Sequence, residues 1–115
     1  MKNYSNKRFH QALADILRDK KVKLRGLANR TNLDHTYFSK LKSRKNSPPI
    51  KTMEIIAEGL GIDPGYFLEY RIHRITSFLQ DNPGYVENVM SFIEELKKKD
   101  RLKVAEKPES YKAGD

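Results

Sequence analysis

Apolar side chains recur three or four residues apart through most of this 115-residue chain, which is the spacing of one face of an α-helix. No stretch alternates apolar and polar residues over more than a few positions, so β-strands are not predicted. The main apolar faces contain Phe9, Leu13, Ile16 and Leu17; Leu24, Leu27 and Ala28; Phe38 and Leu41; Ile50, Met53, Ile56, Ala57 and Leu60; Leu68, Ile72, Ile75 and Leu79; and Val86, Val89, Met90, Ile93 and Leu96. The pattern therefore predicts an all-α fold.

Residues that favour helix ends separate these faces. Asn32 tolerates the left-handed backbone that closes a helix, and Asp34 is a good N-cap for a helix that runs through Leu41. Gly61 is a natural stop after the fourth face. Asp63-Pro64 and Asn82-Pro83 each place a capping residue before a proline, which predicts that a helix starts at each pair.

The composition predicts a small intracellular protein without catalytic machinery. The chain has no cysteine, and no His, Asp and Glu grouping matches a three-ligand metal site or a catalytic motif. We therefore expect no enzyme activity, no metal and no cofactor. No apolar run approaches the ~20 residues of a membrane span, and the N-terminus lacks the apolar stretch of a secretory signal. These features predict a cytoplasmic protein that does not enter a membrane.

Positive charge is concentrated between residues 18 and 51. This basic segment holds eleven basic residues and two acidic ones, a net charge of +9, while the rest of the chain sums to −1. Like charges at close range repel one another, so a fold gains nothing from such a concentration by itself. A polyanion that docks on this segment would explain it, and DNA is the first candidate.

Residues 22–62 carry a motif that is similar to a known family. Leu27-Ala28, Asn32-Leu33, Phe38, Leu41, Pro48, Ala57 and Leu60-Gly61-Ile62 together resemble the helix-turn-helix of phage repressor and Cro-like regulators, also called the Xre family. The similarity covers roughly residues 9–70, and Tyr66–Arg71 resembles the fifth helix of such regulators. It implies a repressor-like five-helix domain at residues 8–70 that binds double-stranded DNA.

The resemblance also implies which residues read bases. The family contacts base edges with residues just after the N-cap of the third helix and one turn later, which here are His35, Thr36 and Lys40. Ser39 flanks them on the same helix. These side chains suit the chemistry, because Lys donates to guanine, Thr offers a methyl group to thymine, and His donates or accepts. An ordinary polar helix face is the alternative interpretation.

A second set of residues is expected to contact phosphates. In the family, the short polar loop after the third helix follows the sugar-phosphate backbone and carries no sequence information. Arg25 lies near the start of the second helix, and Tyr37 fits either a phosphate contact or packing. The loop candidates in this chain are Ser43, Arg44, Lys45 and Asn46.

Three residues depart from the family pattern. Leu24 stands where the family often has a glutamine that contacts phosphate, and Lys42 stands where it often has a glutamate paired to the first helix. Gly26 lies inside the short second helix, where glycine costs about 1 kcal/mol relative to alanine. A close approach of another backbone is one explanation for Gly26, and relaxed selection is the other.

The chain continues past the expected domain with two more apolar faces. Residues 71–99 are expected to form a helical extension, and its last helix is expected to end at Lys97–Lys99. Phe67 and Phe78 widen the apolar stripe that runs from Leu68 through Leu79. Residues 100–115 are polar and are expected to be a disordered tail. The apolar residues exceed what one small core needs, so we predict a homodimer whose interface is centred on Phe78, Val89, Phe92 and Ile93.

Two other functional classes stay open at this stage. The same fold serves as a protein-interaction platform in antitoxins and adaptors, although the basic segment argues against a purely protein partner. RNA binding would favour aromatic residues among the basic ones, and only Tyr37 and Phe38 occur there. The sequence shows no evident small-molecule effector. It predicts a DNA-binding transcriptional regulator, with repression as the favoured mode.

Overall fold

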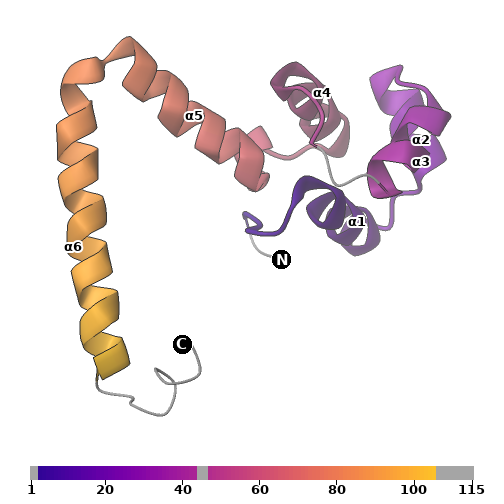
Figure 1. Cartoon of the computed structure of the whole chain (residues 1–115). Helices are drawn as coiled ribbons and strands as arrows, with labels where there is room; N and C mark the ends of the chain where they lie inside the picture. The colour runs from indigo at the N-terminus through magenta and orange to yellow at the C-terminus, as the bar shows by residue number, and fades with distance from the viewer. Residues whose placement is uncertain (1–2, 44–46, 106–115) are drawn as a thin grey trace. The chain divides into compact units, whose positions relative to one another are not determined.

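The computed structural model describes residues 3–43 and 47–105, and within these residues every regular element is helical (Figure 1). The all-α fold predicted from the sequence is confirmed for this part of the chain. The chain divides into two compact units, residues 1–76 and 77–115, and α5 crosses the boundary. The elements are α1 (Phe9–Lys20), α2 (Leu24–Thr31), α3 (His35–Ser43), α4 (Ile50–Leu60), the 3-10 turn η1 (Pro64–Tyr66), α5 (Leu68–Asp81), the 3-10 turn η2 (Pro83–Tyr85) and α6 (Val86–Ala105).

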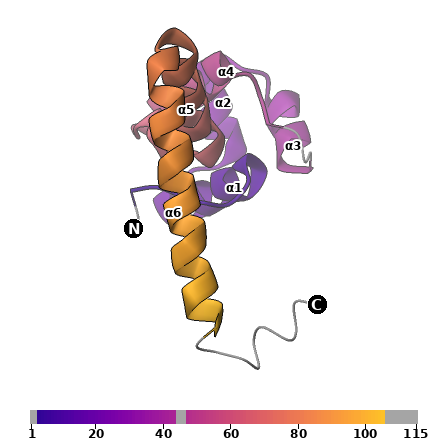
Figure 2. The same ribbon diagram turned by 60° about the vertical axis from the view of Figure 1, so that its left-hand side comes forward.

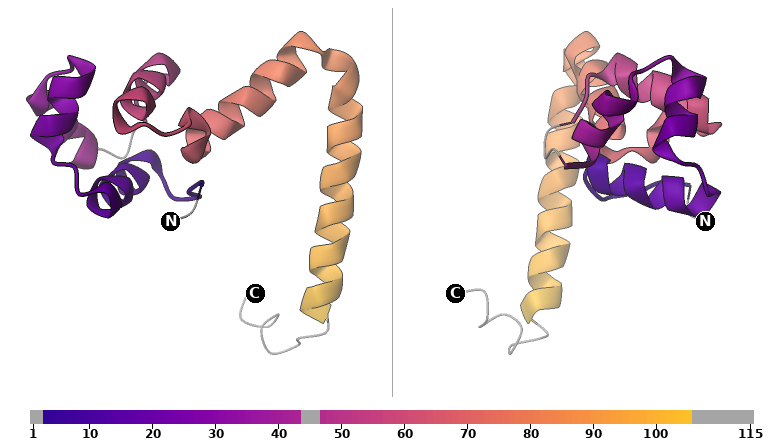
Figure 3. Two further views of the ribbon diagram at one scale, coloured as in Figure 1. Left: turned by 180° about the vertical axis from the view of Figure 1, so that it is seen from behind. Right: turned by 90° about the vertical axis from the view of Figure 1, so that its right-hand side faces the viewer.

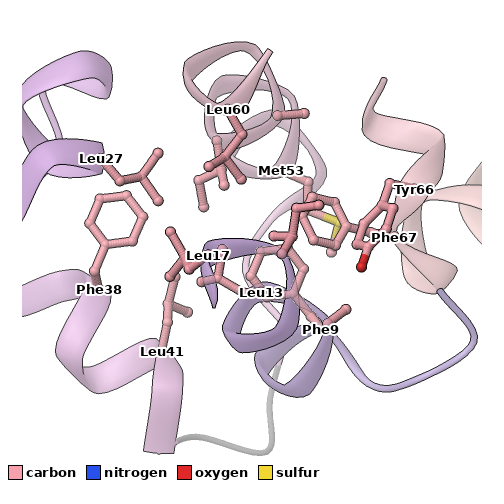
Figure 4. Close-up of a cluster of buried hydrophobic side chains, with 14 of the residues drawn as sticks. Phe9, Leu13, Leu17, Leu27, Phe38, Leu41, Met53, Leu60, Tyr66 and Phe67 are labelled. Carbon is pink, nitrogen blue, oxygen red and sulfur yellow. The ribbon is translucent and has the colours of Figure 1, made fainter. Parts of the chain in front are cut away.

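The first unit is built on one apolar core (Figure 4). Each of the first four helices turns its apolar face inward, as the spacing of the sequence predicts. The phenylalanines Phe9, Phe38 and Phe67 are almost fully buried, and Leu33 is partly buried at the edge. Aromatic and aliphatic burial of this kind supplies most of the stability of a small domain.

Three residues in the described part of the chain close a helix with left-handed backbone, and the sequence predicted two of them. Asn32 has φ 60° and Gly61 has φ 70°, which confirms the predicted helix ends. The third is Lys21, with φ 56°, whose backbone N–H donates to the carbonyl of Arg18. A lysine is strained in this region relative to glycine, so a left-handed cap at this position could not be predicted from the residue type.

Two predicted helix starts differ in the structure. At Asp63 the carboxylate does accept a hydrogen bond from Gly65 N–H at 2.6 Å, but it caps a 3-10 turn, and α5 begins only at Leu68. At Asn82 the side-chain amide donates backward to the Phe78 carbonyl at 2.9 Å, so it ends α5 and does not cap η2. Each proline opens a single tight turn that reorients the chain before the next helix.

The first unit also includes η1 and the start of α5, which corrects the assignment of Phe67. The sequence placed Phe67 in the apolar stripe of the extension, but its ring packs on Phe9 at a centroid distance of 4.5 Å and is fully buried. Tyr66 packs edge-on against it at 5.4 Å. Because Phe67 lies between η1 and α5 with extended backbone (φ −86°, ψ 131°), its side chain follows a different direction from the helix face that continues through Ile72.

Polar contacts fasten the start of α5 to the N-terminal segment. One carboxylate oxygen of Glu69 accepts a hydrogen bond from Phe9 N–H at 2.9 Å, which satisfies an open donor at the start of α1. The guanidinium of Arg71 donates to the carbonyls of Gly65, Tyr66 and Ser5 at 2.8–2.9 Å. The bonds from Phe9 to Glu69 and from Arg71 to Ser5 span 60 and 66 residues of the chain, so the N-terminal segment and α5 support each other.

Two glycines inside helices have opposite surroundings. A Cβ on Gly59 of α4 would meet Thr31 Cγ2 at 2.6 Å and Leu27 Cδ1 at 3.3 Å, so α2 and α4 pack at this glycine. The Thr31 side chain has little freedom, because its hydroxyl donates to the carbonyl of Leu27 at 2.9 Å. A Cβ on Gly26 of α2 would meet nothing within 4 Å among the described residues, so no close approach in that part of the chain explains this glycine.

These surroundings predict opposite effects of alanine on stability. Gly59→Ala forces α2 and α4 apart at a cost of about 1–3 kcal/mol, which outweighs the helix propensity that alanine adds. Gly26→Ala gains about 0.5–1 kcal/mol of unfolding free energy because only the propensity changes. Thermal denaturation measures both: the midpoint should fall for Gly59→Ala and rise for Gly26→Ala. Equal shifts in the two variants would contradict the packing of α2 on α4.

The second unit contains η2 and the long helix α6 (Figure 3). The prediction that this helix ends at Lys97–Lys99 is wrong, because α6 continues to Ala105 and takes in the first six residues of the expected tail. Residues 106–115 lie outside the described part of the chain. The ring of Phe78 contacts that of Tyr85 at a centroid distance of 5.4 Å across the corner formed by η2.

Candidate nucleic-acid interface

The helices α2 and α3 and the turn between them form the frame of the interface (Figure 2). Leu27 of α2 and Phe38 and Leu41 of α3 are buried in the shared core, so each helix has one face fixed inward. The turn is closed by the left-handed Asn32 and by Asp34, whose carboxylate accepts from Thr36 N–H at 3.1 Å. This capping bond confirms the role predicted for Asp34 and fixes where α3 begins.

All four residues expected to read bases lie on the exposed side of α3. His35, Thr36, Ser39 and Lys40 are exposed, because the apolar positions of the same helix point into the core. The Ser39 hydroxyl donates to the His35 carbonyl at 3.3 Å, so this side chain has an acceptor within the helix. Its oxygen retains lone pairs that can accept a hydrogen bond. Together these four side chains form one exposed polar strip along α3.

The structure places the expected phosphate contacts unevenly. Arg25 is exposed in the first turn of α2, and Tyr37 is half-buried with its ring against Phe38 at 6.0 Å, so packing accounts for part of its surface. Ser43 was expected in the loop, but it is the last residue of α3. The other loop candidates, Arg44, Lys45 and Asn46, lie outside the described residues.

The starts of α1, α2 and α4 have neither a side-chain cap from the N-cap residue nor an acidic residue in the first turn, and at α1 the carboxylate of Glu69 accepts from Phe9 N–H instead. The first intrahelical bonds of α2 and α4 run from Leu27 N–H to the Lys23 carbonyl and from Met53 N–H to the Pro49 carbonyl. The amide groups ahead of them therefore point outward in a first turn that carries positive dipole charge. Exposed Lys51 lies in the first turn of α4 and was not singled out by the sequence.

Ion pairing separates Arg18 from the rest of the basic segment. The carboxylate of Asp15 accepts from Lys7 at 2.7 Å and from Arg18 at 3.1 Å. These contacts, the hydrogen bond from Lys7 first among them, hold the pKa of Asp15 below its usual range. Arg30 donates to the Gly59 carbonyl at 3.3 Å, at the C-terminal end of α4 where a cation is favoured. Both arginines thus have acceptors within the protein.

Two tyrosines at the junction of η1 and α5 have raised pKa values. Burial is the main reason that the pKa of the Tyr66 hydroxyl is raised. The Tyr70 hydroxyl donates to the carboxylate of Glu54 at 2.7 Å, and this bond is the main reason that its pKa is raised. Both groups therefore stay neutral donors at physiological pH and support the packing of η1 and α5 on α4.

The described residues contain neither a cluster of metal-ligating side chains nor a helix that could span a membrane. In residues 3–43 and 47–105, no three His, Cys, Asp or Glu side chains come together as metal ligands. No helix in that part of the chain is long and apolar enough to cross a bilayer.

Comparison with protein families decides the class of this domain. A family model, the Cro/C1-type HTH DNA-binding domain, matches residues 12–71, which is more than half of the chain. The chain belongs to the Cro/C1-type HTH DNA-binding family. The matched region contains α2 and α3 and ends within α5, so this DNA-binding domain coincides with most of the first unit. Neither the curated proteins nor the solved structures contain a significant match.

The residues expected at a dimer interface are open to solvent or only partly covered. Phe78, Phe92 and Ile93 are 52%, 63% and 43% exposed, and Val89 is intermediate. Phe78 lies on α5 and the other three lie on α6, and large apolar side chains rarely stay this exposed in such numbers on a monomer. The surrounding exposed apolar residues of α5, η2 and α6 are Ile72, Ile75, Tyr85, Met90 and Leu96.

Proposed function

We propose that this protein is a sequence-specific transcriptional regulator of the repressor type, which inserts α3 into the major groove of double-stranded DNA. The observation that supports this most directly is the exposed polar strip of α3 in a domain of the Cro/C1-type family. An α-helix fits the major groove, where every base pair offers a distinct pattern of donors and acceptors. His35, Thr36, Ser39 and Lys40 would make those contacts.

Phosphate contacts on both sides of α3 would hold this helix in register. We assign them to Arg25 and Lys51, beside the uncapped starts of α2 and α4, and to the loop residues Arg44 and Lys45. Backbone amides at a helix start and nearby cations both favour a phosphate oxygen. These contacts supply affinity and orientation without reading sequence.

A homodimer would complete the regulator. One reading helix contacts only a few base pairs, so a two-fold dimer that reads two half-sites about 34 Å apart gains specificity. The exposed apolar residues Phe78, Val89, Phe92 and Ile93 are the proposed interface. A regulator of this type would act in the compartment that holds the DNA, which in a cell without a nucleus is the cytoplasm.

Binding to a duplex at different salt concentrations tests the proposed function. Six or more phosphate contacts predict that affinity falls about a thousandfold or more between ~50 and ~200 mM salt, because docking releases condensed counterions. Selection from a pool of random duplexes should enrich a palindromic sequence. Binding that ignores salt, or a pool that yields no enriched sequence, would contradict DNA reading and favour a protein-interaction role for the same fold.

A further inference from the structure

The apolar stripe of α6 is nearly symmetric about its own midpoint. Val86 and Leu96 lie five residues before and after Ser91, and Val89 and Ile93 lie two residues before and after it. Residues seven positions apart in a helix share one side, so Val86 and Ile93 lie on one line and Val89 and Leu96 on the next. A second copy in the reverse direction therefore places apolar groups opposite apolar groups along the whole stripe.

Charge at the two ends of the stripe differs sharply. Tyr85, just before α6, lies seven residues before Phe92 and is 53% exposed. Lys99 lies seven residues after Phe92, on the same side of the helix, and is also exposed. From Val86 to Leu96 the charged residues are all acidic, Glu87, Glu94 and Glu95, and from Lys97 to Arg101 they are basic apart from Asp100. Of the charged side chains from Glu87 to Arg101, Glu94 and Lys97 form the one ion pair, at 3.7 Å, in the described structure.

The direction of pairing decides whether these charges repel. In a parallel pair, the basic end of each helix would lie beside the basic end of the other, which is unfavourable. In an antiparallel pair, Lys99 would lie near the ring of Tyr85 in the other copy, where a cation is favoured over the aromatic face. The aliphatic stems of the lysines would cover apolar surface at the ends of the stripe.

We propose that two copies of this chain associate through antiparallel α6 helices, with the two-fold axis at the level of Ser91 and Phe92 along the helix and on the face that carries Val89 and Ile93. Val86 of one copy then packs opposite Leu96 of the other, Val89 packs opposite Ile93, and the two Phe92 rings meet near the axis. This arrangement rests on the proposed homodimer and specifies its geometry. The starts of the two α6 helices point to opposite ends of the pair, which separates the chains that lead to the two reading units.

Cysteine cross-linking tests the direction, because the natural chain has no cysteine. The full-length variants Val86→Cys and Leu96→Cys are oxidised separately and after mixing with exchange of subunits. In the antiparallel pair, a cysteine at 86 faces one at 96, but two cysteines at 86 are about 15 Å apart along the axis. A disulfide needs Cα atoms within about 7 Å, so the covalent dimer should form in the mixture and stay minor in either variant alone.

The outcomes separate this geometry from the proposed function. Efficient cross-linking of each variant alone would show a parallel pair and overturn the antiparallel arrangement, while the homodimer and DNA reading would stand. No cross-link in any sample, together with the mass of a monomer by light scattering at tens of micromolar, would overturn the α6 pairing itself. Salt-dependent duplex binding, measured on the same variants in their reduced form, reports separately whether the domain reads DNA.

Discussion

Ile93→Glu is expected to convert the protein into a monomer and to lower its affinity for a palindromic site by about a hundredfold or more. The side chain of Ile93 is 43% exposed in the single chain and lies close to the proposed two-fold axis. Each new carboxylate would then face Val89 of the other copy inside an apolar interface, with the second carboxylate only about 6 Å further along the axis, and desolvated like charges are costly there. In the dimer, binding of one domain to its half-site holds the second domain close to the other half-site, which raises the overall affinity by about 10²–10⁴. The monomer loses this gain.

Ser91→Glu is the matched control for this variant. Residue 91 is exposed and lies two positions before Ile93, which is about 200° around the helix, so it adds the same charge on the opposite face. Light scattering and a duplex-binding assay should show a dimer of normal affinity for Ser91→Glu and a weak-binding monomer for Ile93→Glu. If both variants stay dimeric with unchanged affinity, the interface lies elsewhere.

The fold was predictable to the extent that local sequence determines it. Helix faces follow from spacing, and the ends at Asn32, Asp34 and Gly61 follow from capping chemistry that a few neighbouring residues decide. Phe67 was misplaced because periodicity shows that a residue faces a core but not which core it joins. The bond from Phe9 N–H to Glu69 spans sixty residues, and no local pattern signals it.

The candidate site shows the same division. Exposure of His35, Thr36, Ser39 and Lys40 follows from the inward direction of Phe38 and Leu41, so it was accessible from the pattern. The base-reading roles depend on the partner and stay a prediction. The internal acceptors of Arg18 and Arg30, and the left-handed Lys21, were not accessible, because each depends on how the helices meet. Counting charges alone therefore overestimated how many basic side chains of residues 18–51 are left without an acceptor inside the protein.

Lys40→Ala is expected to change which bases the protein prefers and not only how tightly it binds. Lys40 is exposed on α3 one turn after His35 and Thr36. If α3 enters the major groove as proposed, a lysine at this position would reach the acceptor atoms of guanine. Loss of a good base contact costs about 1–3 kcal/mol against the preferred base, or about 5- to 150-fold in affinity. The preference at one position of each half-site should relax, while other positions stay as they were.

Arg25→Ala provides the contrast that gives the Lys40 result its meaning. Arg25 is exposed in the first turn of α2, away from the reading strip, and it is assigned to phosphate. Its loss should weaken binding to all sequences alike and flatten the salt dependence by about one ion per contact, because one fewer counterion is released. Affinity for a set of single-base operator variants, measured at several salt concentrations, separates the two effects. A shift of base preference in Arg25→Ala, with uniform weakening in Lys40→Ala, would mean that α2 and not α3 enters the groove.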